Sequence, residues 1–94
     1  MNLFFVSVDV VHHAQDRRPA KDRQAAIERV LRDLKARRAL ERLWLVRSNK
    51  SAAELLQDLK PHFGARDGAV VIEVKGSVAH WWTMETISDL VQGP

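Results

Sequence analysis

The 94-residue chain has the length of one small domain, and its 46% hydrophobic and 29% charged residues are typical of a folded globular protein rather than a disordered one. It contains no cysteine, which excludes a disulfide framework, a thiolate nucleophile and a cysteine-ligated zinc site. The formal charge of +3 is unevenly distributed: residues 1–50 carry a net positive charge, residues 51–94 a net negative one, and ten of the 15 basic residues are arginine. One-sided basicity of this kind favours a polyanionic partner, although a solvated arginine-rich helix gives the same composition.

The first element expected is a β-strand over residues 3–10. Its side chains alternate between two faces, with Phe4, Val6, Val8 and Val10 on one and Leu3, Phe5, Ser7 and Asp9 on the other. Both faces are mostly apolar, so we expect a central strand that is covered on both sides. The apolar run is too short to span a bilayer and no basic segment precedes it, so we expect a cytoplasmic protein without a membrane partner.

A helix is expected from about Lys21 to Arg37, after a polar loop that ends near Pro19. The apolar residues at three- and four-residue spacing are Ile27, Val30, Leu31 and Leu34. A short strand at Ala39–Leu40 and a tight turn at Glu41–Arg42 are expected to lead into a strand over residues 43–47.

The second half of the chain again predicts a helix followed by a strand. Ser51 and Glu54 have the spacing of a capping box, which begins a helix whose apolar stripe is Leu55, Leu56, Leu59 and Phe63. Pro61 and Gly64 end that helix, and a last strand is expected over residues 69–75. Residues 79–94 are expected to form a tail or a short helix that packs on a partner subunit.

This order predicts a single ferredoxin-like α+β domain over residues 1–94, with the arrangement βαββαβ. Short connections and right-handed crossovers give a four-stranded antiparallel sheet with both helices on one face. The other face is then open and apolar, with Leu3, Phe5, Val71 and one side of the Trp44 strand on it. A second copy would bury that face, so we expect a homodimer through the open sheet face.

Several short motifs resemble a known family. They are the first strand that ends in an acid, Val6-Ser7-Val8-Asp9-Val10; the segment from Leu43 to Ala52, in which a tryptophan strand leads to a serine-capped helix; the last strand over Asp67–Val74; and a tail that contains Trp81. Their order and spacing resemble the CRISPR-associated Cas-two family of small dimeric ferredoxin-like proteins, and in particular its SinR-like relatives. The chain lacks the Gln-Ser-Val-Phe-like third strand that is frequent in the Cas-two proteins.

The resemblance implies a dimer with Asp9 of each subunit near the two-fold axis. In Cas-two relatives the corresponding acid is proposed to hold a divalent metal, Mg or Mn, for phosphodiester hydrolysis, whereas other members act only as nucleic-acid scaffolds. From the residues alone, Asp9 is a candidate catalytic and metal-binding carboxylate. The alternative is a carboxylate that caps the next loop or forms an ion pair with Arg17 or Arg47. His12 or His13 could join a metal site, but a pair of surface-loop histidines is the commoner explanation.

Two basic clusters are candidate phosphate-binding groups, because arginine and lysine contact phosphates without reading sequence. Trp44, Trp81 and Trp82 could stack on bases, although such residues more often fill a core or an interface. The residues of the two clusters are Arg17, Arg18, Lys21 and Arg23 in the first and Arg37, Arg38 and Arg42 in the second.

The sequence therefore predicts a dimeric nucleic-acid-binding protein that binds the phosphate backbone of DNA or RNA through arginine-rich segments. One alternative is a metal-dependent endonuclease, a ribonuclease or deoxyribonuclease, that uses Asp9 from both subunits. Another is a non-catalytic regulatory or toxin–antitoxin-type interaction module. Binding ranks before catalysis because only one convincing acidic site residue is visible.

Overall fold

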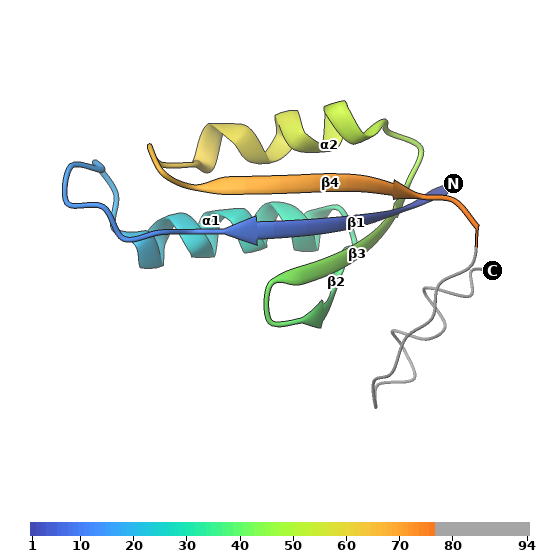
Figure 1. Cartoon of the computed structure of the whole chain (residues 1–94), viewed down its shortest axis with the longest axis horizontal. Coiled ribbons are helices and arrows are strands. Elements are labelled where there is room, and N and C mark those ends of the chain that lie inside the picture. Colours follow the sequence, from blue (N-terminus) through green and yellow to red (C-terminus); the bar gives the residue numbers. More distant parts are fainter. Residues whose placement is uncertain (77–94) are drawn as a thin grey trace.

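A four-stranded antiparallel sheet is the framework of the computed structural model, which describes residues 1–76 (Figure 1). The strands lie in the order β2-β3-β1-β4, an arrangement compatible with a ferredoxin-like fold. The expected segment 79–94 lies outside the described residues. The elements are β1 (Asn2–Asp9), α1 (Ala20–Asp33), β2 (Arg37–Leu40), β3 (Leu43–Ser48), α2 (Ala52–Leu59), the 3-10 helix η1 (Lys60–His62) and β4 (Gly68–Val74).

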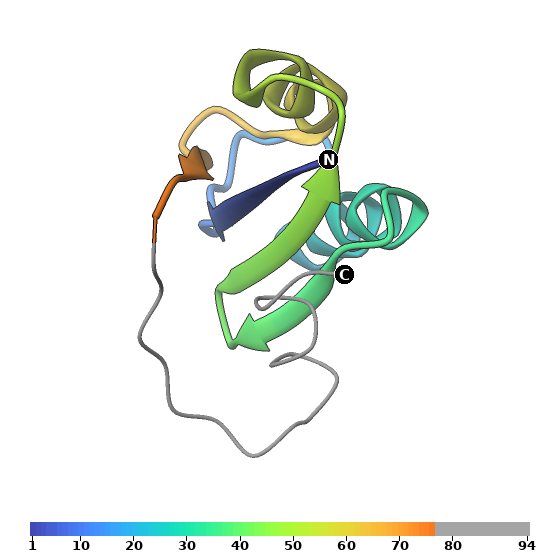
Figure 2. The same ribbon diagram turned by 90° about the vertical axis from the view of Figure 1, so that its right-hand side faces the viewer.

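Both helices lie on one side of the sheet, and the main core lies between these two layers (Figure 2). The prediction that the first strand is central is confirmed, since β1 pairs with β3 on one side and with β4 on the other. Trp44 is buried in the core, which is the commoner of the two roles considered for it. The buried core residues are Phe4, Val6, Val8, Trp44 and Val46 from the sheet and Ile27, Leu31, Leu55 and Leu59 from the helices.

The first helix is shorter than predicted. It ends at Asp33, four residues before Arg37, and Lys35 adopts the left-handed backbone conformation with a φ of 63°. A left-handed residue just after a helix turns the chain out of the helical path. The freed residues extend β2 to Arg37–Leu40, and the expected turn at Glu41–Arg42 joins it to β3.

The capping box at the start of α2 is confirmed. The Ser51 hydroxyl accepts a hydrogen bond of 3.1 Å from the amide of Glu54, and the Glu54 carboxylate accepts one of 2.9 Å from the amide of Ser51. The hydrogen bond from the Ser51 amide to the Glu54 carboxylate lowers the pKa of Glu54, and the Ser51 side chain adds to this effect. The two residues together satisfy amides that the helix itself leaves unpaired.

Replacing Ser51 by alanine is expected to lower the free energy of unfolding by about 1 kcal/mol, the usual effect of losing an N-cap side chain. Urea denaturation followed by circular dichroism measures this change. Gln57→Ala, an exposed substitution within the same helix, is the control and should leave the midpoint nearly unchanged. Equal effects of the two substitutions would mean that the cap contributes nothing specific.

The open face of the sheet differs from the prediction in one strand. The register places Val71 opposite Val6, so Val71 faces the helices and packs on the main core. Val70 and Ile72 face the other way and are 56% and 54% exposed. The alternation within the strand was predicted correctly, but the side assigned to Val71 was wrong, because only pairing with β1 fixes which set of residues faces the helices.

Candidate nucleic-acid interface

Ten of the 15 basic residues lie in residues 17–42, a segment with only four acidic residues. This segment forms the end of the loop before α1, the helix α1 itself, the strand β2 and the turn that leads into β3. The ion pair of 2.9 Å between Glu28 of α1 and Arg38 of β2 shows that the helix and this edge strand are neighbours. The positive charge of the sequence is therefore gathered along α1 and the adjoining hairpin.

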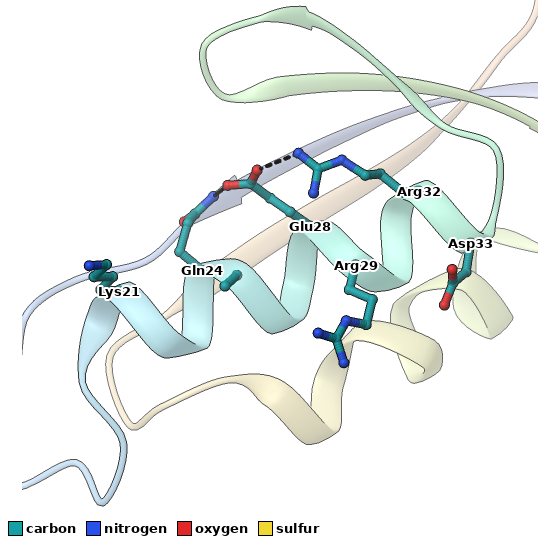
Figure 3. A pocket seen from close by; sticks show the side chains of 7 residues that line it. Lys21, Gln24, Glu28, Arg29, Arg32 and Asp33 are labelled. Carbon is teal, nitrogen blue, oxygen red and sulfur yellow. Dashed lines mark hydrogen bonds and ion pairs between the residues drawn. The ribbon is translucent and has the colours of Figure 1, made fainter.

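The outer side of α1 carries a shallow, open hollow of about 620 Å³ (Figure 3). Its one carboxylate near the middle, Glu28, receives hydrogen bonds from Gln24 at 2.9 Å and Arg32 at 3.2 Å. Arg29 and Arg32 both line this hollow, and their side chains extend in opposite directions from it. The residues that line the hollow are Lys21, Gln24, Ala25, Glu28, Arg29, Arg32 and Asp33.

Arg29 and Arg32 were not among the predicted phosphate-binding residues, yet both are exposed on this helix. A signal for them was present in the sequence. Arg29 lies between the apolar residues Ile27 and Leu31, and Arg32 directly follows Leu31. Neither arginine falls on the apolar stripe that faces the core. Helical periodicity therefore places them toward solvent.

Most of the predicted phosphate-binding residues are on the surface. Arg17, Arg18 and Lys21 are exposed in the loop before α1 and in its first turn. Arg38 is 43% exposed and its guanidinium lies 5.0 Å from the centre of the Trp44 ring. The position of Arg37 differs, since its register with Leu45 places it on the open face of the sheet.

Arg23 lies in the interior instead. Its side chain is only 3% exposed, and its Nε donates a 2.9 Å hydrogen bond to the carboxylate of Asp67. Its remaining nitrogens donate to the carbonyl oxygens of Arg18 and Val11, and Asp16 lies 3.3 Å away. The hydrogen bond from Arg23 to Asp67 raises the pKa of Arg23 despite its burial. With every nitrogen engaged, Arg23 joins the loop after β1 to the loop before β4 and lies outside the basic surface.

Asp9 lies at the end of β1 on the open face and is 59% exposed. It forms an ion pair of 3.2 Å with Arg42, which is itself 70% exposed. Both residues line a smaller hollow of about 300 Å³ between α1, the end of β1 and the β2–β3 hairpin. Asp9 is therefore held beside a cation of the basic segment.

Residues 1–76 contain no group of three or more His, Cys, Asp or Glu side chains that could hold a metal ion. His12 is exposed, and the half-buried His13 has an Nδ1 atom with no hydrogen-bond partner in the described part of the chain. In the described part of the chain, the ion-pair partner of Asp9 is Arg42.

The described part of the molecule also has no helix of the length and apolar character needed to cross a lipid bilayer. Searches of protein-family models, curated proteins and solved structures found no match to this chain.

Proposed function

We propose that this protein binds nucleic acid by contacting the phosphate backbone through a basic surface along α1 and the β2–β3 hairpin. The observation that carries the proposal is that every residue of this surface is exposed, while two of the carboxylates beside it, Glu28 and Asp9, are paired with arginines of the surface. The basic surface consists of Arg17, Arg18, Lys21, Arg29, Arg32, Arg38 and Arg42.

The length of the surface suits a backbone contact. The 14 residues of α1 extend about 21 Å, which is roughly the distance spanned by six phosphates of one strand at about 3.4 Å each. Arginine is the side chain whose planar fork best matches a phosphate group. Such contacts fix position on the backbone and carry no sequence information, so we propose binding of low sequence selectivity.

Catalysis has weaker support than binding. The endonuclease alternative needs Asp9 from two copies to share one metal ion, and Asp9 here faces Arg42. The interaction-module alternative needs no polyanion at all. Salt-dependent binding of nucleic acid would therefore favour the proposal and the endonuclease over the interaction module. Cleavage that needs Mg²⁺ and disappears in Asp9→Asn would select the endonuclease.

Binding is expected to weaken steeply with salt, because each phosphate contact releases about 0.9 counterion. Fluorescence anisotropy with a labelled duplex, a single-stranded DNA and an RNA of equal length, between 50 and 300 mM KCl, measures the effect. If three to six of the seven cations touch phosphate, the slope of log K against log salt is roughly −3 to −5. Absence of binding, or binding that does not respond to salt, would instead favour a protein–protein interaction module.

A further inference from the structure

Two residues of the open sheet face are buried although neither helix packs there. Leu45 is 0% exposed and Leu3 is 7% exposed, and both point away from the helices. Within residues 1–76, the partly buried apolar residues that pack against them are Phe5, Ala39 and Val74, which all belong to the sheet. Neighbours within one sheet layer cover the flanks of a side chain but not its tip. A further layer over the centre of this face would account for the burial of both side chains.

The chain itself continues beyond the described residues from a suitable point. Val74, the last residue of β4, pairs with Leu3, so the 18 residues after Gly76 start beside the buried pair. Gly76 has a φ of 91°, which only glycine adopts easily and which turns the chain out of the strand direction.

The remaining length is sufficient to cross the whole sheet. Four strands are three spacings wide, roughly 14 Å at about 4.8 Å each. Eleven helical residues, as in 81–91, would extend about 16 Å. A segment that leaves β4 can thus reach the far edge strand β2.

The composition of this segment also matches the face. Residues 77–94 contain no lysine or arginine and two acids, Glu85 and Asp89. The face is apolar at its centre, with the exposed Arg37 on β2 near its edge. An acidic amphipathic segment would bury its apolar side and leave its carboxylates toward that edge. The apolar side chains it supplies are Val78, Trp81, Trp82, Met84, Ile87, Leu90 and Val91.

We propose that residues 78–91 dock on the open sheet face of their own chain, over Leu3, Phe5 and Leu45, as a third layer opposite the helices. The segment then occupies the centre of the surface through which a homodimer was expected from the sequence. Among the described strands, the exposed apolar residues that stay available for a second copy are Val70 and Ile72 on β4 and Leu40 on β2. This inference is independent of nucleic-acid binding, which uses the side of the molecule along α1.

A disulfide cross-link in the full-length chain tests the proposal, because the natural sequence has no cysteine. Ser7→Cys places a thiol at an exposed position on the open face, and it is combined in turn with Met84→Cys or Ile87→Cys. Oxidation at low protein concentration, followed by non-reducing electrophoresis and mass spectrometry, is expected to give an intramolecular disulfide in at least one pair. Gln57→Cys on the exposed side of α2, with the same partners, is the matched control and is expected to give none.

A second measurement does not depend on disulfide geometry. A nitroxide attached to the single cysteine of Ser7→Cys is expected to broaden the indole NMR signals of Trp81 and Trp82, whereas a nitroxide at Gln57→Cys leaves them sharp. A disulfide that links two chains would overturn the proposal in favour of a second copy on this face. Failure of both the cross-link and the broadening would overturn it outright, while salt-dependent binding of nucleic acid would be unaffected.

Discussion

Replacing Asp67 by alanine is expected to lower the free energy of unfolding by about 3 kcal/mol. The side chain of Asp67 is fully buried, and its carboxylate accepts hydrogen bonds from the amides of Val11 and Gly64 at 2.9 and 2.7 Å. It is also the main ion-pair partner of Arg23. Alanine leaves a buried guanidinium and two amides without their acceptor, which is the situation in which removing one partner is most costly.

The pH dependence of stability gives this prediction a second readout. Burial alone would raise the pKa of Asp67, but the hydrogen bond from Arg23, assisted by the Gly64 and Val11 amides, outweighs burial and lowers it. Because the folded-state pKa lies below the unfolded value of about 3.9, the stabilisation is complete above that value and is lost as the pH falls through the folded-state pKa. Asp67→Asn is therefore expected to remove part of the acid sensitivity of the natural chain.

Urea denaturation of each variant between pH 7 and pH 2.5 measures both effects. Asp58→Ala is the control, since Asp58 pairs with Lys50 on the surface and its loss is expected to cost less than about 1 kcal/mol. If Asp67→Ala were no more destabilising than Asp58→Ala, the buried network would not hold the two loops together.

The same network shows where sequence reasoning reached its limit. Arg23 and Asp67 are 44 residues apart, and nothing in the composition distinguishes a buried arginine from its exposed neighbours. One signal was present: Arg23 lies four residues before Ile27 and eight before Leu31, on the stripe that faces the core. Gly64 belongs to this network too, since a Cβ there would come within 2.7 Å of Asp16 and 2.8 Å of Arg23.

The fold was easier to predict because its signals are local. The alternation of β1 identified a central strand, and the spacing of Ser51 and Glu54 located the start of α2. The end of α1 was missed, because Leu34 continues the apolar pattern while the left-handed Lys35 stops the helix. The side of Val71 was missed because register is a property of two strands and not of one.

Reversing the charge of Arg29 and Arg32 together, by substitution with glutamate, is expected to weaken nucleic-acid binding by about 100-fold or more near 100 mM salt. A charge-assisted hydrogen bond is worth roughly 1.5–3 kcal/mol, which is about tenfold or more in affinity for each contact, and the new carboxylates add repulsion. The salt slope is expected to become shallower by about 2, one for each lost phosphate contact. Arg32 is 66% exposed and its pair with Glu28 contributes little to stability, so the fold should persist.

The matched control is Lys60→Glu with Arg66→Glu, which changes the net charge by the same amount at exposed positions between α2 and β4. Anisotropy titrations of both double variants, with thermal unfolding to confirm that each is folded, separate a local surface from a general charge effect. A defined surface along α1 predicts a large loss for the first variant and a small one for the second. Equal losses would mean that only the overall charge attracts the polyanion, and the basic surface proposed here would then have no special role.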